Sequence, residues 1–188
     1  MIFEKKKGRK TMAFDREELL EKLATALVAN PGSTMQELAD KAGISKASLH
    51  RIYSTKEKLQ ETIVERVRNV FAEIRRTIQK PHEDYREALR ELVAIHCQNS
   101  TYVLFTGRDD FFAMIGDKQW DDYYNDLEIF FREGQERGIL TLDFSAGVIG
   151  DIFISLVTGI LECSLWGHLT QRELEKTILR ALLGGIQK

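Results

Sequence analysis

The chain has 188 residues and a mass of 21.6 kDa, with 43 % hydrophobic and 30 % charged residues. This composition indicates a soluble chain with a sizeable core, and two prolines and 13 glycines are too few for the many tight turns of a sandwich or barrel. Two cysteines, Cys97 and Cys163, exclude a disulfide framework, and the charged start of the chain is no secretory signal. We therefore expect a cytoplasmic protein.

Charge is distributed unevenly along the chain, although the formal net charge is only −2. Residues 1–60 hold 12 Lys/Arg and 8 Asp/Glu, a net charge of +4, whereas the remainder holds 15 and 21, a net charge of −6. A basic end on an acidic body is typical of proteins that contact phosphates at that end. The basic run 5–10 has two interpretations: residues 1–14 form an arm that follows a DNA groove, or they form a solubilising tail.

Capping signals divide the next part of the chain into helices. A helix starts at the box Asp15-x-x-Glu18 and ends at Asn30-Pro31-Gly32, with Phe14 and Leu19 spaced as a hydrophobic staple. A second, short helix is expected from the box Thr34-x-x-Glu37 to the glycine at 43, and a third from Ser45 through Tyr53.

A longer helix follows and spans residues 54–80, from the box Ser54-x-x-Glu57 to Pro81. At about 25 residues it can link two domains rigidly. Apolar spacing predicts further helices over 85–96, 110–115, 117–137, 144–166 and 170–186, the last with the box Thr170-x-x-Glu173. The expected fold is all-α with about nine helices. The expected domains are the arm 1–14, a DNA-binding domain 15–58, and a ligand-binding and dimerisation domain 59–188.

Residues 34–53 form a helix-turn-helix pattern. Gly43 can adopt the positive φ that a sharp turn needs, and Ala39, Ile44 and Leu49 are placed to pack the two helices together. The second helix then carries short polar residues and cations at its start, which suit the major groove. Two short helices around a glycine also occur in proteins that bind no nucleic acid.

The segment 19–67 resembles the N-terminal domain of the TetR/AcrR family of bacterial transcriptional repressors. The residues that carry this resemblance are Leu38-Ala39-x-x-Ala42-Gly43-Ile44-Ser45-Lys46-x-Ser48-Leu49-x-x-x-Tyr53-x-x-Lys56-Glu57-x-Leu59. The chain length and helical C-terminal part fit the family throughout. The stretches 130–138 and 48–51 are similar to its NfxB-like branch, repressors of multidrug efflux operons.

The resemblance implies a set of DNA contacts. Gln36 falls where a base is reached from the first helix of the motif, and Lys56 where a lysine binds a phosphate. His50 replaces a DNA-contacting tyrosine, the ring of Tyr53 is expected to be structural with its hydroxyl toward phosphate, and Ile52 departs from the pattern and receives no contact. The predicted DNA-binding residues are Thr34, Gln36, Ser45, Lys46, Ala47, Ser48, His50, Arg51, Tyr53 and Lys56.

The last two expected helices have broad apolar surfaces. One helix-turn-helix reads few base pairs, so useful affinity calls for two copies on a two-fold site, with recognition helices about 34 Å apart. The resemblance implies the same homodimer, closed by four helices. Burial within one subunit explains either apolar surface singly. The predicted interface residues are Ile152, Leu156, Ile160, Leu174, Ile178 and Leu182, on surfaces that also include Phe144, Val148 and Ile186.

Aromatic residues gather in the middle of the chain. In a repressor of the resembled family they would line a cavity for an apolar or cationic effector, which shifts the population to a conformer with wrongly spaced recognition helices. An aromatic stripe at helical spacing is more often packed core, and acidic residues usually mark a solvated face. The expected lining residues are His96, Phe105, Phe112, Trp120, Tyr124, Leu127, Phe131 and Phe153, with Asp109, Asp110, Asp121, Asp122 and Glu128 placed to offset a cation.

Other functions find little support in the sequence. The most apolar stretch has an uncharged centre of ten residues, Ile152–Leu161, and a membrane span needs about twenty. His96 and Cys97 are adjacent and point to different sides of a helix, so no metal site is expected. No phosphate loop or nucleophile elbow occurs, and no cofactor is expected. The alternatives to a DNA-binding repressor are an enzyme with a helical pocket and a helical protein-interaction module.

Overall fold

The computed structural model describes residues 15–107 and 109–186, and all their side chains except those of Asp109, Asp110 and Phe112. The described residues form ten α-helices and one short 3₁₀ helix, so the all-α prediction is confirmed. In chain order these are α1 (Arg16–Ala29), α2 (Met35–Ala42), α3 (Lys46–Ile52), α4 (Lys56–Gln79), α5 (Tyr85–Gln98), α6 (Ser100–Thr106), α7 (Asp109–Ile115), α8 (Asp117–Glu136), α9 (Ala146–Leu165), η1 (Gln171–Glu173) and α10 (Leu174–Ile186).

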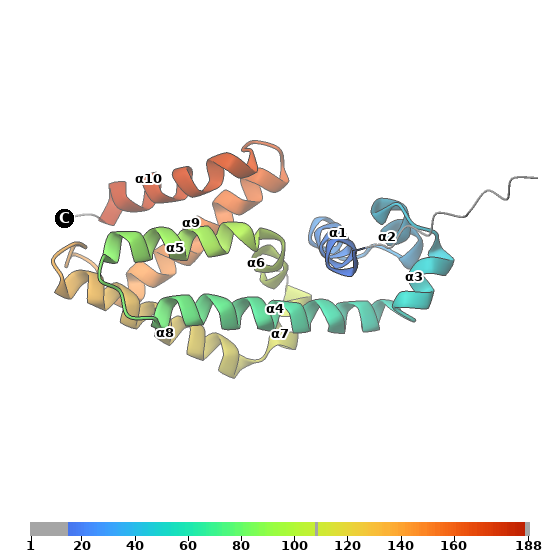
Figure 1. Cartoon of the computed structure of the whole chain (residues 1–188), viewed down its shortest axis with the longest axis horizontal. Coiled ribbons are helices and arrows are strands. Elements are labelled where there is room, and N and C mark those ends of the chain that lie inside the picture. The colour runs from blue at the N-terminus through green and yellow to red at the C-terminus, as the bar shows by residue number, and fades with distance from the viewer. Residues whose placement is uncertain (1–14, 108, 187–188) are drawn as a thin grey trace, which may run out of the picture.

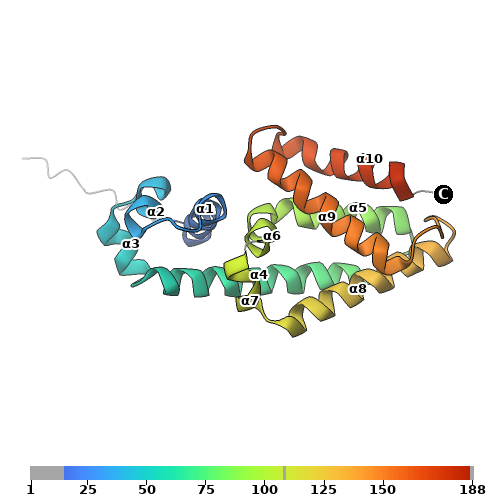
Figure 2. The same ribbon diagram turned by 180° about the vertical axis from the view of Figure 1, so that it is seen from behind.

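The molecule is elongated, with two regions joined by α4 (Figure 1). We call α1–α3 the head and α5–α10 the body. The head lies at one end, and α4 runs from it along the body to the opposite end, where the described chain also finishes. Figure 2 shows the same arrangement from behind, with α9 crossing the body and α10 on its outside.

The head is held together by a small core and well-formed helix caps. Thr34 and Glu37 form the predicted capping box, and the Ser45 hydroxyl accepts a hydrogen bond from the Ser48 amide (3.1 Å). Gly43 ends α2 with φ of 71°, the left-handed conformation that the turn requires. Leu49 of α3 is fully buried, so the other face of this helix remains for solvent.

The N-cap of α4 lies one residue later than the sequence indicated, and the helix covers 56–79 of the expected 54–80. Its N-cap is Thr55, whose hydroxyl accepts from the Lys58 amide (3.2 Å), rather than Ser54. With 24 residues it is about 36 Å long at 1.5 Å per residue. Arg66 ties it to both regions: Nε donates to Glu17 Oε1 of α1 (2.7 Å), and the guanidinium lies 5.2 Å from the Tyr102 ring centre of α6.

The helix α6 accounts for the difference between about nine expected helices and ten observed. Its residues 102–106 are all buried, so the apolar periodicity that identifies a surface helix is absent. It also touches the head, because the Thr25 and Thr101 hydroxyl oxygens lie 3.1 Å apart. One face of α6 thus packs on the head while its other residues reach into the body.

The helix α9 corrects the expectation that length excludes a membrane span. It continues for 20 residues through Asp151 and Glu162 with mean hydropathy 1.8, so it is long and apolar enough to cross a membrane by length and composition alone. Only 28 % of its most apolar window is buried inside the protomer. The buried residues, including Phe153 and Leu161, follow one face, which leaves a second apolar face outside.

Candidate nucleic-acid interface and internal cavity

The first turn and the outer face of α3 lie at the tip of the head (Figure 1). Lys46, Ala47, His50 and Arg51 are exposed, and neither Lys46 nor Arg51 forms a hydrogen bond or ion pair with any described residue. The Ser45 hydroxyl donates to the Ser48 hydroxyl (2.9 Å), which fixes both short side chains at the N-terminus of the helix. This surface offers cations and small hydroxyls on a convex rod about as wide as a major groove.

The predicted residues of α2 are exposed, but their side chains are engaged. The Thr34 backbone amide donates to Glu37 Oε2 (2.7 Å), and Thr34 Oγ1 donates to the same oxygen (2.9 Å). The backbone bond, and then the hydroxyl bond, lower the pKa of the Glu37 carboxyl. Gln36 Nε2 donates to Asp40 Oδ1 (2.8 Å). A partner that binds Gln36 must therefore compete with Asp40.

Two further predicted residues serve the structure of the head as well. Lys56 is half-buried, and its ammonium donates to the Pro31 carbonyl oxygen (2.7 Å), joining the start of α4 to the loop after α1. Tyr53 is half-buried, and burial raises the pKa of its hydroxyl. This position fits the structural ring that the sequence indicated. His50 Nδ1 lies 3.0 Å from the Ser54 carbonyl oxygen.

A cavity of about 140 Å³ lies in the body beside α4. Three of the residues that the sequence placed in such a cavity line it: His96 of α5, and Trp120 and Tyr124 of α8. The other described lining residues are not among the eight that the sequence predicted. These are Phe71, Val103, Thr106, Gly107, Tyr123, Ile154, Val157 and Thr158. Tyr123 is one of the aromatic residues in the middle of the chain, which were expected to line a cavity as a group, whereas Thr106 and Thr158 carry no sequence signal.

The buried floor of the cavity is a pair of hydrogen-bonded rings. His96 Nδ1 is 2.7 Å from the Leu92 carbonyl oxygen, and Nε2 is 2.8 Å from the Tyr123 hydroxyl oxygen. Burial lowers the pKa of His96 to about 4 and raises that of Tyr123. Both rings are therefore neutral near pH 7, and a neutral imidazole that faces a carbonyl through Nδ1 carries its proton there. Nε2 then accepts the Tyr123 hydrogen.

Four predicted lining residues belong to the packed core instead. The ring of Phe105 stacks on Phe111 with centroids 3.9 Å apart, and Phe131 and Phe153 contact each other at 5.6 Å behind the cavity wall. Leu127 is fully buried and does not line the cavity either. Aromatic and aliphatic side chains fill both kinds of site, so spacing alone did not separate them. The side chain of Phe112 lies outside the described residues.

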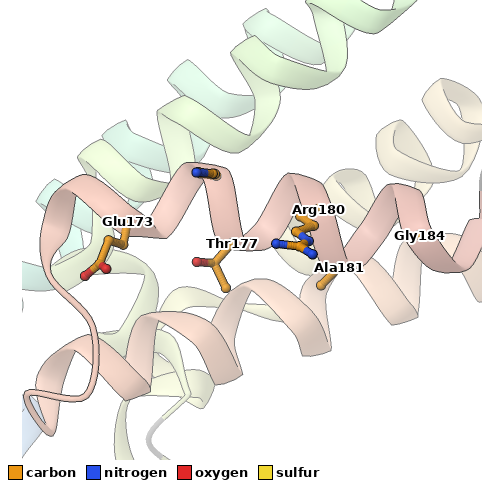
Figure 3. A pocket seen from close by; sticks show the side chains of 6 residues that line it. Glu173, Thr177, Arg180, Ala181 and Gly184 are labelled. Carbon is orange, nitrogen blue, oxygen red and sulfur yellow. The ribbon is translucent and has the colours of Figure 1, made fainter.

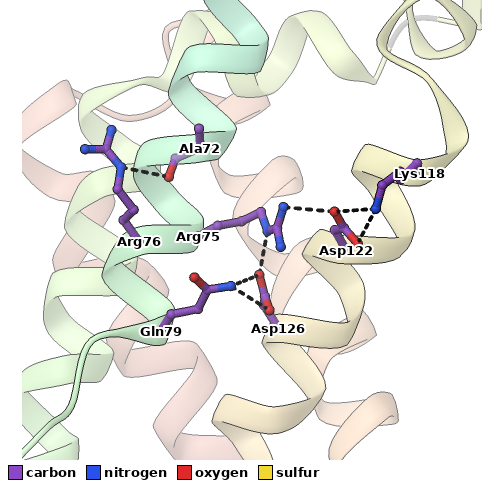
Figure 4. Close-up of polar contacts among 7 residues, drawn as sticks. All are labelled: Ala72, Arg75, Arg76, Gln79, Lys118, Asp122 and Asp126. Atoms are coloured by element: carbon purple, nitrogen blue, oxygen red, sulfur yellow. Dashed lines mark hydrogen bonds and ion pairs between the residues drawn. The ribbon is translucent and has the colours of Figure 1, made fainter.

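Two of the acidic residues expected near a cation, Asp122 and Glu128, are paired elsewhere, and Figure 4 shows the cluster around Asp122. Arg75 of α4 donates to Asp122 (3.1 Å) and Asp126 (2.5 Å) of α8, and Gln79 binds both oxygens of Asp126. This cluster fastens α4 to α8 on the outer side. Glu128 is ion-paired with Arg132, and Asp121 is exposed. No described carboxylate lines the cavity, and the side chains of Asp109 and Asp110 lie outside the described residues.

Comparisons with known proteins relate this chain and its fold to one family. The chain is 31 % identical over 179 residues, 93 % of this chain and 96 % of the other, to the HTH-type transcriptional regulator NfxB of Pseudomonas aeruginosa. This chain belongs to the TetR family of transcriptional regulators. It is thus a DNA-binding regulator with a helix-turn-helix, from a family without enzymatic activity. No family model matches the chain.

Solved TetR-like structures share the whole fold of this regulator. The ketosteroid transcriptional regulator KstR2 of Mycobacterium tuberculosis superposes with a TM-score of 0.67 at 22 % identity, covering 92 % of this chain and 95 % of its own. A putative transcriptional regulator from Saccharomonospora viridis, solved in complex with choline, superposes with a TM-score of 0.63 at 16 % identity, covering 92 % and 97 %. These likenesses support the arrangement of a helix-turn-helix head on a helical body.

The two apolar surfaces predicted for dimerisation behave differently in this TetR-family chain. On α9, Val148 and Ile152 are exposed, and Leu156 and Ile160 are half-buried. On α10 the prediction was wrong for Leu174, Ile178 and Leu182, which are at most 1 % exposed because they pack inside the same protomer. Burial within one subunit therefore explains the α10 surface but not the α9 surface.

The outer face of α10 instead carries polar and small side chains along a shallow groove of about 590 Å³ (Figure 3). Thr177, Ala181 and Gly184 follow one another at helical spacing, with Glu173, Lys176 and Arg180 beside them. Small residues at this spacing allow another helix to approach closely. Among the described residues, no group of three or more His, Cys, Asp or Glu side chains could hold a metal ion.

Proposed function

We propose that this regulator is a homodimeric repressor that binds a palindromic operator through α3 and releases it when an effector enters the body. The observation that carries the proposal is the outer face of α3, whose cations at positions 46 and 51 are exposed at the tip of the head without a partner among the described residues. It acts in the cytoplasm, where its operator lies. The similarity to NfxB supports control of a multidrug efflux operon.

Within α3 we assign base contacts to the first turn and phosphate contacts to its neighbours. Lys46, Ala47 and Ser48 are assigned to base edges because they lie on the exposed start of the helix, where recognition helices meet bases. Gln36 is also assigned to a base. The remaining assigned side chains position the head on the sugar-phosphate backbone. They are Thr34, Ser45, His50, Arg51, Tyr53 and Lys56.

For the dimer we propose the outer faces of α9 and α10. The exposed Val148 and Ile152, with the half-buried Leu156 and Ile160, give α9 an apolar stripe that water contacts in the protomer. The small residues 177, 181 and 184 let α10 of a second copy come close. Two helices from each protomer then form a four-helix interface, and the two α3 helices lie about 34 Å apart.

The effector site we propose is the cavity beside α4. Phe71 of α4 is part of its wall, so a bound molecule acts on the helix that leads to the head. Val103 and Thr106 of α6 also line it, and α6 touches the head through Thr101. An effector that fits better when α4 and α6 have moved shifts the population toward a conformer that the operator cannot accept.

The deciding experiment is a gel shift with DNA from upstream of the protein's own gene. We expect tight binding that weakens steeply with salt. Lys46→Ala should cost about tenfold in affinity and relax sequence preference, whereas Arg51→Ala should weaken all sequences alike and reduce the salt dependence. Lys118→Ala is the matched control, because this lysine side chain on α8 is 89 % exposed and far from α3 along the fold.

Two results would contradict the proposal. Unchanged operator affinity in both α3 variants removes the assigned interface, and a strictly monomeric species in analytical ultracentrifugation removes the dimer. Ile152→Glu tests the dimer directly, since a buried carboxylate on the α9 stripe should dissociate it. Partition of the wild type into lipid vesicles, without dimerisation, would assign the stripe to a membrane instead.

A further inference from the structure

Four polar side chains of the cavity wall share one property: their hydrogens are already used. The His96 imidazole donates to the Leu92 carbonyl and accepts from the Tyr123 hydroxyl. The Thr106 hydroxyl donates to the Val103 carbonyl oxygen (2.7 Å), and the Thr158 hydroxyl donates to the Ile154 carbonyl oxygen (2.8 Å). None of these four side chains has a hydrogen left for a bound molecule.

What they still offer is acceptor capacity. A hydroxyl oxygen that has donated its hydrogen retains lone pairs, so Tyr123, Thr106 and Thr158 can each accept a hydrogen bond from a ligand. None of the described lining residues is charged. Two of the described lining residues are exposed: Gly107, and Tyr124, which is 41 % exposed. Toward a ligand, these four side chains of an otherwise largely apolar wall therefore present acceptors and no donor.

We infer that the effector of this cavity is a small neutral molecule with one ring and a hydrogen-bond donor, such as a phenol or an aniline, and that carboxylates are rejected. This inference rests on the proposed function, in which the cavity is the effector site. A carboxylate would lose its water, would find no cation among the described lining residues, and would meet no donor on the four hydrogen-bonded side chains, which makes its burial costly. An ether or ester of the same shape would bring a second acceptor to a site made of acceptors.

The volume of the cavity and the lack of charge on its described lining residues restrict the class of effector further. A cavity of about 150 Å³ in another protein's core holds one benzene ring, so about 140 Å³ suits a single ring with one substituent. The ring faces of Phe71, Tyr123 and Tyr124 attract cations, but a buried cation also needs a counter-charge, which no described lining residue supplies. Neutral donors satisfy the acceptors without that cost.

The test is isothermal titration calorimetry of the full chain with four probes that share a benzene ring: phenol, anisole, benzoate and benzylammonium. We expect saturable binding of phenol, at least tenfold weaker binding of anisole, and no saturable binding of either ion. Binding of anisole as tight as that of phenol, or of either ion as tight as that of phenol, would overturn the inference.

A variant reverses the polarity of the site. In His96→Leu the Tyr123 hydroxyl has lost its acceptor, so its hydrogen is free to face the cavity, and the ratio of phenol to anisole affinity should fall at least threefold. His82→Leu is the matched control, because His82 bonds to the Ile78 carbonyl and does not line the cavity, so the ratio should stay unchanged. An unchanged ratio in a folded His96→Leu protein counts against the inference.

If His96→Leu fails to fold, Thr106→Val and Thr158→Val replace it, since each removes one acceptor oxygen while keeping the branched shape. At least one of them should lower the phenol-to-anisole ratio, and two unchanged ratios would overturn the inference. The operator gel shift without ligand separates this result from the proposed function. A chain that binds no operator contradicts the proposed function whatever the probe ranking, whereas operator binding with an inverted ranking contradicts the effector class alone.

Discussion

The head and the body carry their polar side chains in opposite ways. On α3 of the head, Lys46 and Arg51 extend into solvent without a partner among the described residues. In the body, His96 and Tyr123 are buried and satisfy each other. An outward cation attracts a polyanion from a distance, whereas an inward neutral pair selects a ligand by shape and hydrogen bonding. The two regions are thus suited to partners of opposite chemistry.

The largest expected effects come from substitutions of one buried core residue in the body and one in the head. Phe153→Ala removes a fully buried ring behind the cavity and should lower the free energy of unfolding by about 3–5 kcal/mol. Leu49→Ala should cost about 2–5 kcal/mol for the same reason, but in the head. Urea unfolding measures both losses.

Operator affinity distinguishes the two variants. Leu49 fixes α3 against the rest of the head, so Leu49→Ala should also weaken operator binding at a temperature where the protein is folded. Phe153→Ala should leave the operator affinity of the folded fraction within about twofold of the wild-type value. The space that the lost ring leaves lies in the body, where Phe153 contacts the rings of His96 and Phe131. Equal losses of operator affinity in both variants would show that the two regions do not act separately.

The same contrast explains what the sequence could predict. The head was predictable because its signals are local: the Thr34–Glu37 box, the Ser45 cap and Gly43 all formed as the spacing indicated. Most of the cavity lining was not predictable, because Phe71, Val103 and Thr158 come from three helices that only tertiary packing brings together. Phe131 of the core and Tyr124 of the cavity wall belong to the same aromatic pattern of α8, so spacing alone does not separate a core residue from a lining residue.

The second prediction concerns pH and the body. Burial lowers the pKa of His96 to about 4, below the ordinary value of 6.5 that the unfolded chain has. Between these two values the unfolded chain binds a proton that the folded chain does not, so stability falls as pH falls from about 6.5 toward about 4. The total loss from this one group is about 3 kcal/mol.

Urea unfolding at several pH values, for the wild type and His96→Leu, measures this loss. Carboxylates titrate in both proteins, so the difference between the two curves isolates His96. The wild type should lose more stability than the variant below pH 6.5, and the gap should stop growing near pH 4. Parallel curves over this range would mean that His96 is not buried as a neutral ring. They would also contradict the hydrogen bond in which Tyr123 donates to His96 Nε2.

The smallest expected effect concerns the turn before α3 in the head. Gly43 has φ of 71°, and a methyl group added there meets no atom within 4 Å, so Gly43→Ala tests backbone strain without a clash. The expected cost is about 1–2 kcal/mol, because an L-residue disfavours the left-handed conformation. Gly185→Ala in α10 of the body is the matched control: the added methyl group is equally free, but the residue is helical, so stability should rise by about 0.5–1 kcal/mol. Opposite signs for one substitution, read from thermal unfolding, would show that the turn before α3 is fixed by backbone geometry rather than by packing, and a stabilising Gly43→Ala would contradict the turn itself.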